Sequence, residues 1–155
     1  MEREKLYLRR ATIVDTEILY KWRNDSVCRK NSINSEKIEY NDHCIWLSNK
    51  LNSDSCDIFI CMKGDKPIGQ VRVDYENEIG KISYSIASDF RGNNYGSKML
   101  ELLEYNERLR RNVVQLCAMV KHDNVASQKC FTKLNYSKDN RGAFFYYSKL
   151  LCKKE

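Results

Sequence analysis

The spacing of apolar and polar residues predicts strands and helices in alternation along the chain. Strands are expected where apolar residues alternate with polar ones or form a short run, and helices where they recur every three to four positions. The predicted strands are residues 5–12, 57–63, 68–75, 79–87, 113–120 and 143–151. The predicted helices begin at Asp15 as N-cap, at Ser35 as N-cap, after the loop 91–96, and at Asn124, the last one running to residue 134.

The order of these elements, β-α-α-β-β-β-α-β-α-β, predicts an α/β fold with a mixed central sheet and helices on both faces. The 155 residues contain one proline and neither a repeat nor a linker, so we expect a single domain over residues 1–155. No apolar run reaches the ~18 residues that a membrane-spanning helix needs. The first residues carry charges with no apolar stretch behind them, unlike a signal peptide. We therefore expect a cytoplasmic protein without a membrane partner.

Seven cysteines and two histidines raise the question of a metal or disulfide site. The cysteines form no Cys-x-x-Cys pair, and His43 and His122 lie far apart in the sequence. Zinc sites need clustered ligands, and disulfide scaffolds need an even number of cysteines. Cys61 and Cys117 lie inside apolar runs, where a thiol packs as a small hydrophobic side chain. We expect reduced cysteines and no metal.

The net charge of +6 is a modest excess of basic residues. The main basic cluster begins at Arg108 and follows Glu101, Glu104 and Glu107 on one predicted helix, which is typical of a solvated face with ion pairs. Nucleic-acid-binding proteins concentrate lysine and arginine in a stripe, so no nucleic-acid partner is expected. A small ligand that carries phosphate explains the excess equally well.

A loop with two glycines joins the fourth predicted strand to the following helix. It reads Arg-Gly-Asn-Asn-Tyr-Gly-Ser over residues 91–97. Unpaired N–H groups at a helix start form an anion site, small residues let a pyrophosphate approach the backbone, and Arg91 adds a charged donor. An ordinary turn at a helix entrance is the alternative. The loop lacks the Gly-Lys-Ser/Thr of a Walker loop, and a dinucleotide-binding loop would follow the first strand.

Two motifs on the expected elements resemble the GCN5-related N-acetyltransferase (GNAT) superfamily. The first, Arg/Gln-x-x-Gly-x-Gly/Ala after the fourth strand, is matched by Arg91, Asn94 and Gly96, with Asn94 in place of the usual glycine. Asparagine is the residue other than glycine that best tolerates left-handed backbone angles, so the departure is mild. The second motif reads Asn-Val-Ala-Ser-Gln-Lys-Cys-Phe-Thr-Lys-Leu-Asn-Tyr over residues 124–136.

The resemblance covers nearly the whole chain in element order and implies the GNAT fold, in which the fourth strand splays from the fifth. It implies acetyl-CoA as the cofactor, with the pantetheine arm in that gap beside the backbone of Ile86. Asn124 and Ser127 would lie near the reactive end of the arm. The diphosphate would meet the loop formed by Arg91, Gly92, Asn93, Asn94, Tyr95, Gly96 and Ser97.

The motifs leave the catalytic acid and base open. Many members carry a tyrosine acid seven residues after the signature asparagine, where this chain has Phe131, and Lys81 stands where others have a glutamate base. Ser127 occupies a place where some ribosomal-protein acetyltransferases of the superfamily carry a serine, and Tyr136 and Tyr84 are other nearby hydroxyls. We predict Ser127 and Tyr136 as catalytic residues, with a structural role as the alternative for each. Holding the amine beside the thioester supplies much of the acceleration in any case.

The resemblance also implies that the acceptor is chosen mostly by the first two helices. Two arginines, an amide, an imidazole and an indole there suit a nucleotide diphosphate with its base or sugar. His43 and Trp46 share a helix face, whereas both tryptophans also fit the core. The predicted substrate contacts are Trp22, Arg23, Asn24, Arg29, His43, Trp46 and Tyr84.

The pattern Trp-Arg-Asn-Asp…Val-x-Arg…His-x-x-Trp, with Gly-Gln-Val-Arg-Val-Asp at residues 69–74, is similar to the acetyltransferases of bacterial nonulosonic acid synthesis. Those enzymes acetylate the 4-amino group of a UDP-linked 4-amino-4,6-dideoxy sugar on the pseudaminic acid route, which implies a UDP-amino sugar as partner. The alternatives are an N-terminal protein acetyltransferase of the ribosomal-protein kind and a non-catalytic acyl-CoA-binding domain, which Phe131 and Lys81 favour. The aromatic residues 144–147 would suit a homodimer contact, and alternating burial in a sheet explains them as well.

Overall fold

Seven strands form one mixed sheet in the order β1-β2-β3-β4-β5-β7-β6. The structure, a computed structural model, describes residues 4–110 and 112–151. Neighbouring strands are antiparallel except β4 and β5, which run parallel, so the predicted mixed sheet is confirmed. The strands are β1 (Leu6–Arg10), β2 (Cys56–Lys63), β3 (Lys66–Glu76), β4 (Ile79–Ile86), β5 (Gln115–Lys121), β6 (Ser137–Asn140) and β7 (Phe144–Leu150).

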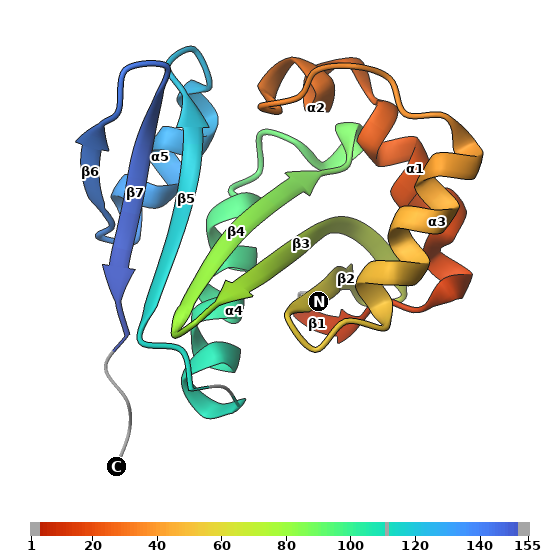
Figure 1. Cartoon of the computed structure of the whole chain (residues 1–155), viewed down its shortest axis with the longest axis horizontal. Coiled ribbons are helices and arrows are strands. Elements are labelled where there is room, and N and C mark those ends of the chain that lie inside the picture. Colours follow the sequence, from red (N-terminus) through yellow and green to blue (C-terminus); the bar gives the residue numbers. More distant parts are fainter. Residues whose placement is uncertain (1–3, 111, 152–155) are drawn as a thin grey trace.

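Helices cover both faces of the sheet, as predicted (Figure 1). The helices α1 (Thr16–Asn24), α2 (Ser26–Asn31) and α3 (Tyr40–Leu51) lie on one side, and α4 (Tyr95–Arg110) and α5 (Val125–Lys133) on the other. The sheet therefore separates two apolar cores. Strand β2, buried on both faces, sends Ile58 and Ile60 into the core under α1 and α3, and Phe59 and Cys61 into the core under α4.

Two short elements are absent from the sequence prediction. Residues 24–26 read as a break, but the Asp25 carboxylate accepts a hydrogen bond from Cys28 N at 3.0 Å and so caps α2. Strand β6 has four exposed residues and no apolar alternation, and it exists because it pairs with the edge of β7. Strand β7 is thereby paired on both edges, with β5 and β6.

One predicted helix cap is wrong, and a second has the predicted position without the expected capping bond. α3 begins at Tyr40 with Glu39 as N-cap rather than at Ser35, since the side chain of Asn24 holds the preceding segment out of helical conformation. Asp15 stands at the N-cap position of α1 but makes no capping bond to it. Its carboxylate instead pairs with Arg9 at 2.8 Å and accepts from the backbone N–H of residue 12, which closes the 3-10 turn before α1.

Six of the seven cysteines lie in the described part of the chain, and all six are free. Cys152 lies outside it. Burial raises the pKa of Cys61 to about 11 and that of Cys56 to about 12, so both pack as protonated, apolar groups. Among the described residues, no cluster of three or more His, Cys, Asp or Glu side chains could hold a metal ion. None of the helices described there is long and apolar enough to cross a membrane.

Candidate active site

The parallel pairing between β4 and β5 stops partway along both strands. The ladder begins at Ile79 and ends at the pair Lys81–Cys117, although β4 runs on to Ile86 and β5 to Lys121. The backbone groups of both strand ends are therefore open to a partner other than a strand. Ligands in open α/β sheets bind at the carboxyl ends of the strands, where this opening lies. It is the splay between the fourth and fifth strands that the resemblance implies (Figure 1).

Ile86, the predicted pantetheine contact, is at the open end of β4. It lies opposite Gly69, and the next bond of the β3–β4 ladder runs from Ala87 N to Ile68 O at 2.8 Å. Ile86 is therefore in a non-hydrogen-bonded pair, and its own N–H and C=O point away from β3, toward the gap. This orientation suits pairing of the Ile86 N–H with an extended arm, while the Ile86 C=O accepts a hydrogen bond from Arg91 Nε.

The loop after β4 bends through two residues in the left-handed region. Gly92 has φ 81° and Asn94 has φ 63°, so the asparagine adopts the angle that the sequence predicts for it. α4 then begins, and the N–H groups of Tyr95, Gly96 and Ser97 have no acceptor within the helix. They make no hydrogen bond to any residue that the structure describes. With the positive end of the helix dipole, these donors suit a diphosphate.

Gly96 lets α4 approach both of its neighbours closely. A Cβ here would lie 3.2 Å from Cys130 Sγ on α5 and 3.5 Å from Cε2 of Tyr84 on β4. The next residue, Ser97, is buried, and its hydroxyl donates to Asn94 O at 3.1 Å. The start of α4 is thus wedged between β4 and α5, which fixes the direction of its N–H groups.

The Arg91 guanidinium is engaged by the protein itself. Its Nη2 donates to Asp25 Oδ2 at 2.7 Å, and its Nε donates to Ile86 O at 3.1 Å. Burial alone would raise the pKa of Asp25, but hydrogen bonds from Cys28 N and Arg91 lower it below its ordinary value. Arg91 therefore ties the loop to the junction of α1 and α2, and its contact with a diphosphate stays a prediction.

Asn93 and Tyr95 turn their side chains back onto the protein. The exposed Asn93 donates to Phe90 O at 3.3 Å and to Arg91 O at 3.2 Å, closing the loop. The Tyr95 ring lies under the Lys63 ammonium, which is 5.3 Å from its centroid. A cofactor contact by either residue would therefore come from its backbone.

Ser127 on α5 and Tyr84 on β4 meet at the gap. Asn124 caps α5 by accepting from Ser127 N at 3.2 Å, and the Tyr84 hydroxyl donates to Ser127 Oγ at 2.9 Å. Tyr136 packs against Phe131 with 4.9 Å between ring centroids, and its buried hydroxyl makes no hydrogen bond to Ser127. The structure thus brings Asn124, Ser127 and Tyr84 together and leaves Tyr136, the other predicted catalytic residue, outside this group.

Three predicted acceptor contacts hold the segment between α2 and α3, residues 32–39. Arg23 and Arg29 donate to backbone carbonyls of this segment at 2.8 Å and 3.1 Å, and the Asn24 amide bonds both the N–H and the C=O of Ile38. The Nη1 atom of Arg23 is buried and has no hydrogen-bond partner among the described residues. These side chains shape the segment that borders the predicted acceptor site.

Trp22 and His43 pack in the interior. Trp22 is 8% exposed and His43 is 2% exposed, with its Nε2 atom 3.0 Å from Thr16 O. His43 stacks on Trp46, with 6.0 Å between ring centroids, as their spacing predicts. Trp46 is partly exposed and carries the Arg72 guanidinium 5.1 Å from its ring centroid. His43 therefore contacts the protein itself, Trp22 packs in the interior at the edge of a hollow, and Trp46 and Arg72 can also meet a ligand.

The buried His43 predicts a pH-dependent stability. Burial lowers the pKa of His43 below its ordinary value of about 6.5. Below pH ~6.5 the unfolded chain binds a proton that the folded chain does not, so stability falls as the pH falls toward the folded pKa. We expect His43→Gln to remove this slope, at most about 1.4 kcal/mol per pH unit, in urea unfolding between pH 5 and 7. His122→Gln, at an exposed position, is the control, and an unchanged slope in His43→Gln would refute the assignment.

A polar face of β3 and β4 under α3 borders the predicted acceptor residue Trp46, and the predicted contacts do not include it. Arg72 donates to Ser83 Oγ at 3.3 Å, and Gln70 donates to Ser85 Oγ at 3.2 Å. Tyr84 lies between the two serines in sequence and points to the opposite face. It is therefore apart from the other predicted acceptor contacts. The alternation of polar and apolar residues over 70–75 could have indicated this face, since it places Gln70 and Arg72 on the same side of the strand.

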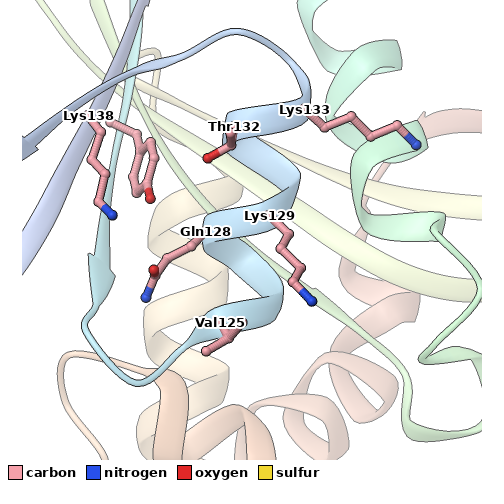
Figure 2. A pocket seen from close by; sticks show the side chains of 7 residues that line it. Val125, Gln128, Lys129, Thr132, Lys133 and Lys138 are labelled. Carbon is pink, nitrogen blue, oxygen red and sulfur yellow. The ribbon is translucent and has the colours of Figure 1, made fainter.

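Two hollows lie near these elements. One of about 190 Å³ is lined by Trp22, Asp25, Ile86 and Arg91 among others, and joins the α1–α2 junction to the open end of β4. The other, of about 400 Å³, lies against α5 and β6 and is lined mainly by lysines and other polar side chains (Figure 2). Its helix residues are on the side of α5 opposite Ser127. The larger hollow is therefore separate from the gap.

The sequence matches the family described as "Acetyltransferase (GNAT) domain" over residues 5–137. The match spans most of the chain, and the chain therefore belongs to the GNAT acetyltransferase family. Its class, an acetyltransferase of GNAT type, is the one that the two motifs predict. No curated protein sequence matches the chain.

Solved structures of other acetyltransferases share the fold. A GNAT-family acetyltransferase from Streptococcus pneumoniae is 18% identical with a TM-score of 0.77, covering 96% of this chain and 100% of its own. RimL, a ribosomal L7/L12 alpha-N-protein acetyltransferase in complex with coenzyme A, is 13% identical with a TM-score of 0.82, covering 97% and 98%. Spermidine N-acetyltransferase from Vibrio cholerae, in complex with CoA and spermine, is 11% identical with a TM-score of 0.84, covering 94% and 95%.

Proposed function

We propose that this chain transfers an acetyl group from acetyl-CoA to a primary amine at the gap between β4 and β5. The observation that carries the proposal is the end of the β4–β5 ladder at Lys81 and Cys117, beside the unpaired N–H groups at the start of α4. An extended pantetheine arm fits the place of the missing strand pairing, with its diphosphate at α4. The coenzyme A in the RimL and spermidine acetyltransferase structures supports the same donor here.

In the proposed reaction the donor supplies an acetyl thioester. A bond forms from the amine nitrogen to the carbonyl carbon, and the C–S bond breaks with its electron pair going to sulfur. The amine loses one proton, and sulfur gains one. The backbone of residues 92–97 would bind the diphosphate, and Ile86 would align the arm. Asn124 and Ser127 would border the thioester. Orientation of this kind is worth up to about 7–11 kcal/mol of a barrier, so positioning is the chain's main contribution.

The acceptor we propose is a nucleotide-linked amino sugar, acetylated at the 4-amino group of a UDP-linked 4-amino-4,6-dideoxy sugar. Two features of the described residues support it. Arg23 has a buried nitrogen without a hydrogen-bond partner among the described residues, and Arg29 lies on the next helix; together the two arginines suit a diphosphate. Trp46 with Arg72 over its ring offers an aromatic and cationic surface to a base or sugar.

A competition experiment tests this function. The protein is incubated with acetyl-CoA, the UDP-4-amino-4,6-dideoxy sugar and short peptides with free N-termini, and the products are separated by mass. We expect acetylated sugar nucleotide. Acetylated peptide in its place would overturn the acceptor and keep the acetyl transfer. Neither product, with acetyl-CoA shown to bind, would reject the amino-sugar acceptor and point to another amine.

Arg29→Ala tests the acceptor contact specifically. We expect the KM for the amino-sugar nucleotide to rise at least about ten-fold, the effect of one lost charged hydrogen bond, while the Kd for acetyl-CoA stays within two-fold. Lys30→Ala, which removes the same charge from the next and exposed position of α2, is the matched control. Equal damage to acceptor and acetyl-CoA binding would make Arg29 a purely structural residue.

A further inference from the structure

The hydroxyl that many family members carry on the helix after the fifth strand is absent here, because that position is Phe131. Another hydroxyl, that of Tyr84 on β4, lies beside Phe131. Tyr84 lies on the part of β4 that pairs with β3 but not with β5. Its ring packs edge-on against Phe131 with 5.9 Å between centroids, and its oxygen lies 2.9 Å from Ser127 Oγ. Ser127, in turn, is 7% exposed and held by the Asn124 cap.

The hydrogen bond between the two hydroxyls leaves one proton unassigned. A serine hydroxyl has one proton to donate and two lone pairs to accept with. Ser127 Oγ accepts from Tyr84, and its own proton finds no acceptor among the residues that the structure describes. A donor buried without an acceptor costs roughly 1–3 kcal/mol, so this arrangement favours a ligand atom that accepts the proton.

We propose that Tyr84 is a positioning residue: its hydroxyl holds Ser127 Oγ so that the Ser127 proton is directed at the sulfur that leaves during acetyl transfer. The inference rests on the proposed function, and it concerns how the leaving group is stabilised. Ser127 keeps its proton and donates a hydrogen bond as the C–S bond breaks and negative charge develops on sulfur. The amine releases one proton to solvent, and the thiolate finally takes one proton from solvent, so the number of protons balances.

The environment of Tyr84 supports a fixed donor. Burial, and next to it the neighbouring Cys130 thiol, raise the pKa of Tyr84 far above its ordinary value. The hydrogen bond with Ser127 lowers this pKa but does not outweigh burial, so the phenol stays protonated over the working pH range and keeps a proton to donate to Ser127. A tyrosine with so high a pKa is a poor general acid. The role of Tyr84 therefore differs from that of the tyrosine acid found in many family members.

The test uses Tyr84→Phe, which removes one oxygen atom. We expect kcat to fall about ten-fold with the KM for acetyl-CoA within two-fold, and Ser127→Ala to lower kcat about 100-fold. The double variant should match Ser127→Ala alone, because Tyr84 acts only through Ser127. Phe131→Tyr in the Tyr84→Phe background restores a hydroxyl and should recover activity. Tyr147→Phe, at a buried tyrosine whose hydroxyl has no hydrogen-bond partner among the described residues, is the matched control and should behave like the parent.

A second readout needs no acceptor. The thiol of bound coenzyme A is titrated by its ultraviolet thiolate absorbance, and we expect Tyr84→Phe and Ser127→Ala each to raise its pKa, because a hydrogen-bond donor to the thiolate is lost. An equal thiol pKa in parent and Tyr84→Phe, or additive losses of kcat in the double variant, would overturn the inference. Failure of coenzyme A to bind any variant or the parent would instead reject the proposed function itself.

Discussion

Gly96→Val is expected to weaken acetyl-CoA binding about 100-fold, a loss of roughly 2.7 kcal/mol. The added Cβ would lie 3.2 Å from Cys130 Sγ and 3.5 Å from the Tyr84 ring, and valine brings two further methyl groups. The start of α4 must then move away from β4 and α5, and the N–H groups proposed to bind the diphosphate move with it. Isothermal titration with acetyl-CoA measures the effect.

Gly96→Ala is the graded control for this prediction. Its single methyl group meets the flexible edge of Cys130 at 3.2 Å, so a shift of a few tenths of an ångström accommodates it and the loss of affinity should be smaller. Neither variant weakens the helix itself, since both residues favour helix more than glycine does. Unchanged acetyl-CoA affinity in a folded Gly96→Val protein would show that the start of α4 does not hold the cofactor.

The fold was predictable because its signals are local. The buried strand β2 is a mostly apolar run, and buried and less buried residues alternate along β3. The loop before α4 is marked in the sequence by Gly92, Asn94 and Gly96. Each of these patterns involves only neighbouring residues, so it can be recognised without knowing how the rest of the chain folds. Strand β6 lacks such a signal, because its four exposed residues become a strand only by pairing with β7.

The sequence identifies candidate residues for the site but not the contacts that these residues make. The motifs identify Arg91 and Ser127, whereas the partners that define their roles, Asp25 and Tyr84, lie 66 and 43 positions away in the sequence. No spacing rule connects such pairs, since only the folded sheet brings α1, β4 and α5 together. The sequence likewise could not show that His43, a predicted substrate contact, is buried against α1.

The bond between Arg91 and Asp25 shows how the two halves of the site depend on one another. Asp25 caps α2, which carries Arg29, and the same carboxylate holds Arg91, the first residue of the loop before α4. Any movement of Arg91 toward a diphosphate would have to release Asp25 or carry α2 with it. The elements proposed to border the acceptor and the loop proposed to bind the donor are thus coupled by one carboxylate.

Gly69→Ala is expected to lower the free energy of unfolding by about 3 kcal/mol, at the upper end of overpacking costs. Its Cβ would lie 2.6 Å from Ser85 O and 3.0 Å from Ile86 Cδ1. Because the Ser85 carbonyl belongs to the backbone of a paired strand, it cannot swing aside, and β3 must separate from β4. Urea unfolding followed by circular dichroism measures the loss.

The same substitution should also weaken acetyl-CoA binding in the protein that remains folded, since Gly69 lies directly opposite Ile86 and its crowding displaces the open end of β4. Gly142→Ala separates crowding from backbone strain. Gly142 has φ 81° with no atom near the added Cβ, so alanine there should cost about 1 kcal/mol and leave acetyl-CoA affinity unchanged. Equal losses of stability in the two variants would mean that β3 and β4 can part at Gly69 without strain, and that the close approach of β3 does not set the position of Ile86.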